Sequence, residues 1–187
     1  MIEDGFMHLF FDRIECAIGP IRIASDGRRL LALDFAGYET RMDALLRKHH
    51  GPFARTDADD PNGLSTLLRA YLAGDLAALG QVAVHTGGTP FQREVWAALG
   101  EIAPGTTTTY GALAARLGRP KASRAVGMAV GQNPVGIVVP CHRVIGAGAA
   151  LTGYAGGLER KRWLLEHEGA LPRTSAPSRR KRVALAS

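Results

Sequence analysis

The stretch GIVVPCHRVIG, residues 136–146, says more about fold and function than any other part of this sequence. Its apolar run, residues 137–139, predicts a strand-like segment that carries Cys141, His142 and Arg143 at its end. A cysteine followed by two basic residues lies in a local positive field that favours the thiolate, the nucleophilic form. A buried, unreactive thiol is the more common role for cysteine, and the local sequence leaves the two interpretations about even.

The segment before this stretch predicts two short helices joined by a turn. Thr109 can cap a helix over residues 110–117, and residues 121–131 are helical again after a Gly-Arg-Pro turn. This spacing fits a helix-turn-helix and an ordinary helical hairpin equally well. The second helix carries mostly small side chains around one long cation, Arg124, which would allow close packing on protein or entry into a DNA groove. Taken alone, the sequence favours close packing.

The first half of the chain reads as β-structure followed by helices. IRIAS (21–25) and LLALDF (30–35) predict strands joined by a turn, residues 38–50 predict a helix, and residues 52–62 predict a loop. A short helix is expected over 64–72.

A glycine pair marks a boundary near residue 88, after which Thr89 and Pro90 predict the start of a helix that runs to residue 102. We therefore expect an α/β protein. An N-terminal α/β domain (1–87), with a β-sheet and flanking helices, precedes a mostly helical C-terminal domain (88–171) and a basic, disordered tail (172–187).

Composition limits the functional class. The 187 residues are 46% hydrophobic and 21% charged, and no apolar run is long enough to span a bilayer, so a cytoplasmic globular protein is expected. Cys16 and Cys141 form no CxxC pair, which argues against a disulfide framework and a cysteine-rich zinc site, and Cys16 is expected to be structural.

The charges are distributed unevenly along the chain. Residues 1–87 hold 9 basic and 12 acidic residues, residues 88–171 hold 9 and 5, and residues 172–187 hold 5 and none. The basic second half indicates a polyanionic partner. The Arg/Lys run at 179–182 fits a solvated end as well as it fits a nucleic-acid contact.

Around residues 140–144 the sequence resembles the O6-alkylguanine-DNA alkyltransferase (methylated-DNA–protein-cysteine methyltransferase) family, whose active-site signature is PCHRV. The likeness extends in order over residues 91–169, through FQREVWAALGEIAPG, TYGALAARLG, NPVGIVVPCHRVIG and LTGYAGGLERKRWLLEHEG. IGPIRIA and LLALDF resemble the family's N-terminal domain more loosely. The resemblance implies a ribonuclease-H-like first domain, a helix-turn-helix in the second, and neither cofactor nor metal.

The resemblance also implies a reaction. A single-turnover protein would flip an alkylated guanine out of double-stranded DNA and transfer the alkyl group from its O6 atom irreversibly to Cys141. His142 would take the thiol proton through a water, and Glu168 would orient His142. By its position alone, Glu168 would be a solvated carboxylate at a helix end. A monomer is expected.

Further roles are implied for residues outside the signature. Asn133 matches a hinge asparagine near the thiol. Tyr110 matches a tyrosine that crowds the 3′ phosphate and donates a proton to the departing base, although its position alone also fits a core aromatic. Arg124 matches a finger that fills the gap in the base stack. The resemblance implies DNA contacts at Ser123 and Ala125, and pocket walls at Val144, Tyr154 and Ala155, the last standing where some members have Ser.

Three other functions are compatible with parts of the sequence. Non-catalytic relatives that bind alkylated DNA carry Trp where this chain has Cys141. A helix-turn-helix regulator would read bases with several polar side chains, and the second helix offers only Lys121, Ser123 and Arg124 before Gln132. A cysteine hydrolase would need oxyanion donors and a turnover step. Each fits the sequence less well than an alkyltransferase does.

Overall fold

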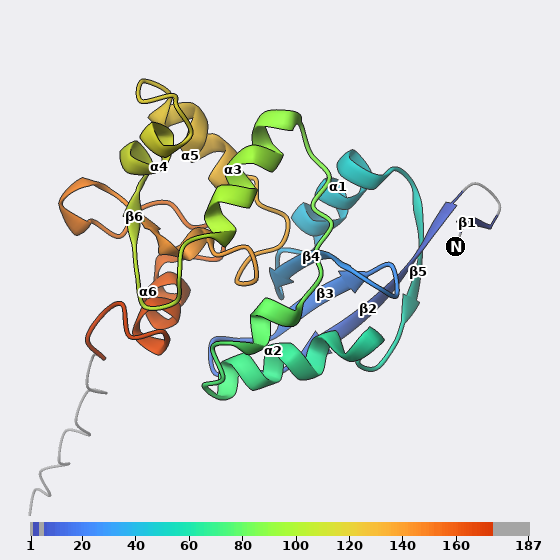
Figure 1. Cartoon of the computed structure of the whole chain (residues 1–187). Helices are drawn as coiled ribbons and strands as arrows, with labels where there is room; N and C mark the ends of the chain where they lie inside the picture. The colour runs from blue at the N-terminus through green and yellow to red at the C-terminus, as the bar shows by residue number, and fades with distance from the viewer. Residues whose placement is uncertain (1, 4–5, 174–187) are drawn as a thin grey trace, which may run out of the picture.

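The computed structural model describes residues 2–3 and 6–173. A sheet with two helices lies on one side of the molecule, and the helical second half lies on the other (Figure 1). The expected basic tail falls almost wholly outside the described residues.

The sheet is built around one long strand, β2. β3 pairs antiparallel with β2, β4 pairs antiparallel with β3, β5 runs parallel to β2, and a short β1 pairs with the start of β2. The strands are β1 (Ile2–Glu3), β2 (Phe6–Ile14), β3 (Ile21–Ser25), β4 (Leu30–Phe35) and β5 (Phe53–Asp57). The strands expected at 21–25 and 30–35 are confirmed.

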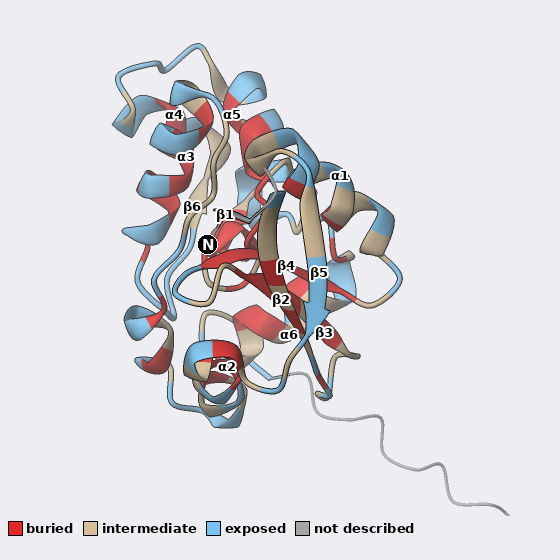
Figure 2. Cartoon of the chain, turned by 90° about the vertical axis from the view of Figure 1, so that its right-hand side faces the viewer, coloured by how far each residue is buried: buried red, intermediate tan, exposed pale blue. Residues whose placement is uncertain are grey.

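The expected loop over 52–62 is wrong in its first half, because β5 lies there. This strand pairs with β2 from Met7–Phe53 to Phe11–Asp57 and forms an edge of the sheet. Its last three residues are exposed, so FARTD shows no apolar alternation by which the sequence could reveal it (Figure 2). The backbone pairing to β2 makes it a strand despite its polar side chains.

The two faces of the sheet are covered differently. Helix α1 (Glu39–His50) covers one face, where Met42 and Leu46 pack on the sheet. Helix α2 (Leu64–Ala73) covers the other face and ends at Gly74, whose φ of 116° is the left-handed conformation that glycine adopts freely. The expected helices at 38–50 and 64–72 are therefore confirmed to within a residue.

The second half is mostly helical, as expected. Thr89 caps the predicted helix and forms a capping box there, because Thr89 Oγ1 accepts from Gln92 N and Gln92 Oε1 accepts from Thr89 N. The helices are α3 (Pro90–Gly100), α4 (Tyr110–Arg116), α5 (Ser123–Gly131) and α6 (Leu158–His167). Two-residue strands β6 (Thr108–Thr109) and β7 (Val144–Ile145) pair in parallel, and short 3₁₀ turns η1 to η4 occupy Pro61–Gly63, Ala78–Gln81, Cys141–Arg143 and Ala147–Ala149.

One hydrophobic core continues across both halves. Buried side chains of β3, β4 and α2 pack in the same cluster as those of α3, α5 and α6. The outer edge of β4 also bonds to the second half, since Leu33 N donates to Pro134 O at 2.9 Å and Gly136 N donates to Leu33 O at 3.3 Å. The sheet edge therefore holds the segment that leads to Cys141.

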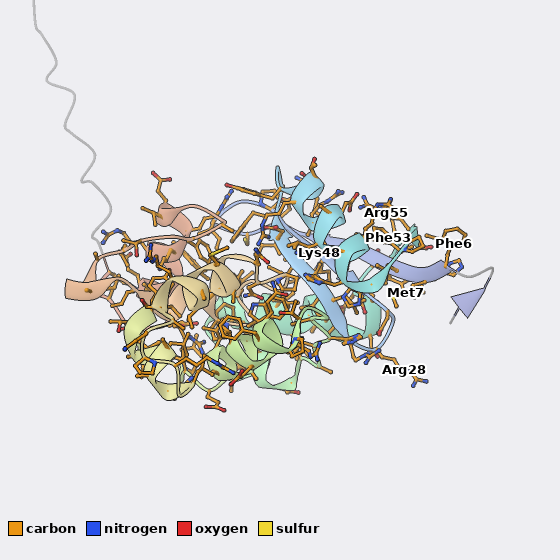
Figure 3. All side chains as sticks on the ribbon, turned by 90° about the horizontal axis from the view of Figure 1, so that it is seen from above. Phe6, Met7, Arg28, Lys48, Phe53 and Arg55 are labelled. Atoms are coloured by element: carbon orange, nitrogen blue, oxygen red, sulfur yellow. The ribbon has the colours of Figure 1, made fainter. Side chains whose placement is uncertain are left out.

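The opposite end of the sheet lies far from this junction. Figure 3 shows Phe6, Met7 and Phe53 there, with Lys48 and Arg55 nearby. Phe6 is 47% exposed.

No helix among the described residues is long and apolar enough to cross a membrane.

Candidate active site

Asn133 organises the turn that precedes the cysteine. Its side-chain nitrogen donates to Val139 O at 2.8 Å, and its side-chain oxygen accepts from Val135 N at 3.0 Å. The expected strand over 137–139 is wrong: Ile137 has a φ of 68°, in the left-handed region that β-branched residues avoid. Backbone bonds within 135–141 turn the chain instead. Asn133, by bonding both ends of the turn, holds this strained backbone in place.

Cys141 starts the turn η3 and lies at a cleft between the two halves. The cleft is lined from the first half by Leu33, Asp34, Phe35 and Arg41, and from the second half by Val130, Gly131, Asn133, Gly136, Cys141 and residues 153–156. The cysteine is 8% exposed, so its sulfur is reached through this cleft. A small group that enters the cleft from outside can therefore reach the thiol.

The electrostatics around the thiol differ from the sequence expectation. Burial raises the pKa of Cys141, while a hydrogen bond from Asn133 and the positive charges of Lys161 and Arg41 lower it. Arg143, the sequence neighbour expected to supply the positive field, makes its contacts with Glu168 instead. The local field predicted from Arg143 is therefore wrong, and cations distant in sequence replace it.

His142 and Glu168 form a buried pair. Both side chains are inaccessible to solvent, and His142 Nε2 lies 3.0 Å from Glu168 Oε1. Since a carboxylate can only accept, the proton between them is on Nε2, which leaves Nδ1 as the basic nitrogen. Nδ1 is buried and has no hydrogen-bond partner among the described residues. Burial lowers the pKa of His142, so its ring is neutral and able to accept a proton at neutral pH.

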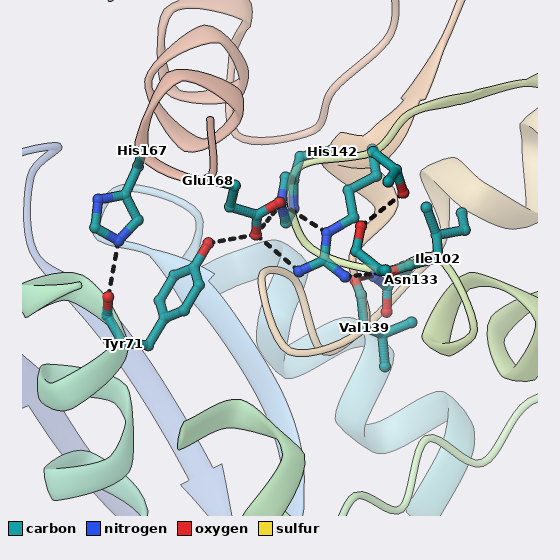
Figure 4. Close-up of polar contacts among 10 residues, drawn as sticks. Tyr71, Ile102, Asn133, Val139, His142, His167 and Glu168 are labelled. Carbon is teal, nitrogen blue, oxygen red and sulfur yellow. Dashed lines mark hydrogen bonds and ion pairs between the residues drawn. The ribbon is translucent and has the colours of Figure 1, made fainter. Parts of the chain in front are cut away.

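Glu168 lies just after α6, where the sequence alone would make it a surface residue, and it is buried. Arg143 binds it with two bonds of 2.8 Å, Nε to Oε2 and Nη2 to Oε1, and the Tyr71 hydroxyl donates to Oε1 at 2.7 Å (Figure 4). Hydrogen bonds from His142, Arg143 and Tyr71 outweigh burial and hold the pKa of Glu168 well below its usual range. The carboxylate is therefore charged and fixed.

Lys161 is a buried lysine on α6. Its ammonium donates to Val144 O and Thr152 O, both at 2.6 Å, and thereby ties together two backbone segments beside the site. Burial lowers the pKa of Lys161 to about 8, although the negative charge of the Cys141 thiolate acts to raise it. Val144 itself is fully buried and lies outside the set of side chains that line the cleft. Tyr154 and Ala155 do line it.

Tyr110 begins α4, capped as expected by Thr109, whose side chain accepts from Ala112 N at 3.1 Å. The Tyr110 hydroxyl lies 3.4 Å and 3.3 Å from the carbonyl oxygens of Thr152 and Gly153, and burial raises its pKa. The hydroxyl is therefore protonated at neutral pH, beside the loop that forms one wall of the cleft.

Helix α5 packs on protein along one side and is exposed to solvent along the other. Gly127 faces the Tyr110 ring, where a Cβ would lie at an ordinary contact distance of 3.6 Å, and Val126 is buried, so one side packs on protein. On the other side Arg124 and Ala125 are exposed, and Ser123 is half-buried. Arg124 has no ion pair within the described part of the chain, and Met128, one turn further along the helix, is 67% exposed.

Sequence reasoning missed three residues of the site: Tyr71, Arg41 and Lys161. Tyr71 and Arg41 belong to the first half and are 97 and 92 positions from their contacts Glu168 and Asn133, so no local pattern could reveal them. Lys161 alone carried a signal, because it falls among buried positions of an amphipathic helix.

Cys16 lies in the turn after β2, where its thiol donates to Gly19 O at 2.9 Å.

No group of three or more His, Cys, Asp or Glu side chains within residues 6–173 is arranged to hold a metal ion.

Comparisons with known proteins agree in both halves. A model of the 6-O-methylguanine DNA methyltransferase DNA-binding domain matches residues 90–170, and one of the ribonuclease-like domain of the same family matches residues 7–85. The curated methylated-DNA–protein-cysteine methyltransferase of Salmonella typhimurium is 51% identical over 168 residues, which cover 88% of this chain and 98% of the relative. The one from Methanosarcina acetivorans is 42% identical over 163 residues, 87% of this chain and 99% of the relative.

A solved structure agrees with this assignment. The OGT of Mycobacterium tuberculosis, crystallised in complex with DNA, superposes with a TM-score of 0.73 and is 39% identical. The alignment covers 86% of this chain and 93% of that chain. The N-terminal α/β domain and the helical domain expected from the sequence are both confirmed. The chain belongs to the 6-O-methylguanine DNA methyltransferase family.

Proposed function

We propose that this protein is a methylated-DNA–protein-cysteine methyltransferase, a DNA repair protein that removes alkyl groups from O6 of guanine and accepts them on Cys141. The observation that carries the proposal is a cysteine at the floor of a cleft, followed in sequence by a histidine whose ring is held by a buried carboxylate. The curated relatives with this name support the reaction.

Thiol activation follows from the geometry of His142. The thiol proton passes to Nδ1, through a bridging water as the family resemblance implies. Glu168 stabilises the resulting imidazolium through Nε2. Asn133, Lys161 and Arg41 favour the thiolate that is left behind. The thiolate sulfur then forms a bond to the saturated carbon as the bond from that carbon to O6 breaks, and the electron pair leaves with the guanine.

Tyr110 is suited to assist the leaving base. Its hydroxyl is protonated at neutral pH, so it can donate a proton to the departing guanine and be restored by the proton held on His142. Tyr154 and Ala155 provide walls on which the base rests, and the Ala155 backbone amide remains available where the side-chain hydroxyl of some relatives is absent. The Val144 side chain does not reach the base, and Val144 would contribute through its backbone carbonyl, which accepts from Lys161 beside the site.

The target must leave the DNA stack, because O6 of guanine faces the major groove inside a stacked pair. Extrusion costs a few kcal/mol and is easiest for damaged or mispaired bases. Helix α5 offers the means: Arg124 is exposed and long enough to occupy the gap, while Ser123 and Ala125 are small enough for the helix to approach the groove. Double-stranded DNA carrying an alkylated guanine is the proposed partner, bound by a monomer.

The product is a thioether, which has no hydrolytic exit, so each molecule reacts once. This distinguishes the proposal from a cysteine hydrolase, which would release product and turn over. A DNA substrate is also the argument for the cytoplasmic location expected from the sequence.

Intact-mass measurement tests the proposal. Mixing the protein with a duplex oligonucleotide containing O6-methylguanine should add one methyl group per molecule, and peptide mapping should locate it on Cys141. The Cys141→Ala variant should bind the duplex without gaining mass. A label on Cys16, or repaired guanine in molar excess over protein, would contradict the proposal.

A further inference from the structure

Tyr71 is a fully buried tyrosine of the first half whose hydroxyl reaches the active site of the second. It stands on α2, and its hydroxyl donates to Glu168 Oε1 at 2.7 Å (Figure 4). The backbone carbonyl of Tyr71 is bonded at 2.7 Å by His167 Nε2 from α6, which fixes α2 against the segment that carries Glu168. The tyrosine is thus held at both ends.

The same carboxylate oxygen serves three donors. Glu168 Oε1 accepts from Tyr71 at 2.7 Å, from His142 at 3.0 Å and from Arg143 at 2.8 Å, while Oε2 accepts only from Arg143 within the described part of the chain. A carboxylate oxygen offers about two lone-pair sites, so the three donors on Oε1 compete for them and each weakens the other bonds. The shortest of the three bonds is the one from the other domain.

The polarity of this bond is fixed. Burial and the charge of Glu168 raise the pKa of Tyr71 far above its ordinary value, so the hydroxyl remains a donor at every pH at which the protein works. The charged and titratable groups that face His142 are Glu168, Arg143 and Lys161. Of these, only Glu168 raises the pKa of His142, and Tyr71 acts on that carboxylate.

We propose that Tyr71 is a positioning residue of the alkyl-transfer reaction: by donating to Glu168 it limits the pull of that carboxylate on His142 and keeps the imidazole neutral. This rests on the proposed function. The first half of the chain is then part of the reaction apparatus, since the proton affinity of the base depends on a hydroxyl that only α2 supplies.

Tyr71→Phe tests the inference, because it removes the hydroxyl and keeps the ring that fills the core. With one donor lost, the Glu168 carboxylate attracts the imidazolium more strongly and the pKa of His142 rises. The acidic limb of the single-turnover rate profile should move upward by about half a pH unit, a fraction of the effect of a lost hydrogen bond to a charged group, because Tyr71 acts on His142 only through Glu168. At a given pH on that limb the variant should react about threefold more slowly, and the two proteins should converge toward the alkaline plateau.

Two comparisons separate positioning from folding. The shift should be equal with methylated duplex and with free O6-benzylguanine, because Tyr71 acts on the thiol's base and not on DNA. Tyr38→Phe is the matched control, since it removes a hydroxyl of the same domain that has no hydrogen bond among the described residues. Its pH profile should be that of the parent protein.

The outcomes are distinct. A parent protein that gains no alkyl group would refute the proposed function itself. If the parent reacts and Tyr71→Phe lowers the melting temperature with an unmoved pH profile, Tyr71 is only a core residue. A shift seen with duplex alone would also overturn the inference, because it would point to DNA binding. Should Tyr71→Phe not fold, Glu168→Gln in the otherwise unaltered chain should move the acidic limb downward, and an unmoved limb there would refute the coupling.

Discussion

The guanidinium of Arg41, on the first helix of the chain, donates to the backbone carbonyl of Asn133 at 3.1 Å, beside the cleft that leads to Cys141. A second bond of 3.1 Å reaches Gly131 O, at the end of α5. The other side of the guanidinium pairs with Asp34 of β4, which is nearly buried. One side chain of the sheet domain thereby fixes the end of α5 and the turn that leads to the cysteine.

Arg41→Leu should therefore impair both stability and reaction. Loss of the guanidinium leaves the Asp34 carboxylate unpaired in a mostly buried place and frees two carbonyls, which should lower the unfolding free energy by about 1–3 kcal/mol. Alkyl transfer should slow with duplex and with free base alike, because the cleft itself is altered. Urea unfolding and single-turnover rates measure the two effects.

Arg47→Leu is the control for this variant, since Arg47 lies on the same helix, is exposed, and makes no side-chain hydrogen bond or ion pair among the described residues, its guanidinium lying over the Phe53 ring. It should change neither quantity by much. Equal losses in the two variants would mean that the position of Arg41 at the cleft has no special importance.

What the sequence could and could not predict follows from the range of the interactions. Thr89 and Thr109 were predictable as helix caps, because a cap depends on neighbours three residues away. The exposed strand β5 was not, since its pairing with β2 is the only thing that makes it a strand. The turn at Ile137 was not either, because apolar β-branched residues ordinarily favour extended backbone.

The same rule applies to the site. PCHRV led to Cys141 and His142, and the family resemblance led to Glu168 and Asn133. The electrostatic partners came from elsewhere: Arg143, adjacent in sequence, is occupied by Glu168, and the cations that act on the thiol are Lys161 and Arg41. A local positive field can be predicted only when side-chain directions are known.

Lys161→Met should raise the pKa of the Cys141 thiol. A charged ammonium favours the thiolate, so its removal makes ionisation harder, and the parent itself should lose this help as pH rises through about 8, where Lys161 loses its proton. The thiolate absorbance in the ultraviolet, followed as a function of pH, measures the shift. Lys121→Met, at an exposed position of the same domain, is the control. An unmoved thiol titration in Lys161→Met would contradict the coupling.

Three histidines near the domain junction should make the fold sensitive to acid. The ring of His50 lies 5.0 Å from that of His85 and 6.4 Å from that of His49, and each has one buried ring nitrogen without a hydrogen bond in the described part of the chain. Burial, with the neighbouring histidines, lowers the pKa of His50 to about 4. Since the unfolded chain takes up the proton near pH 6.5, stability should be lost as pH falls from 6.5 toward 4.

His50→Phe should flatten this dependence, because phenylalanine keeps a ring in the cluster and cannot be charged. Melting temperatures across that pH range measure the effect, and His8→Phe, on β2 and outside the cluster, is the control. A parallel fall in the melting temperatures of His50→Phe and the parent protein would show that other groups cause the acid sensitivity.

Arg124→Ala separates the DNA step from the chemical step. Arg124 is exposed and takes no part in the buried His142–Glu168 pair. We therefore expect it to stabilise only the state in which the base has left the duplex. If it supplies even 1.4 kcal/mol of that stabilisation, its loss slows duplex repair about tenfold. The rate with free O6-benzylguanine should change by less than about twofold, since no flipping is required. Single-turnover rates with both substrates give the ratio directly, and Arg162→Ala, which removes an exposed cation from α6, should leave that ratio unchanged. Equal slowing with both substrates would mean that Arg124 supports the helix packing that Gly127 and Tyr110 display, and that another side chain fills the gap left by the flipped base.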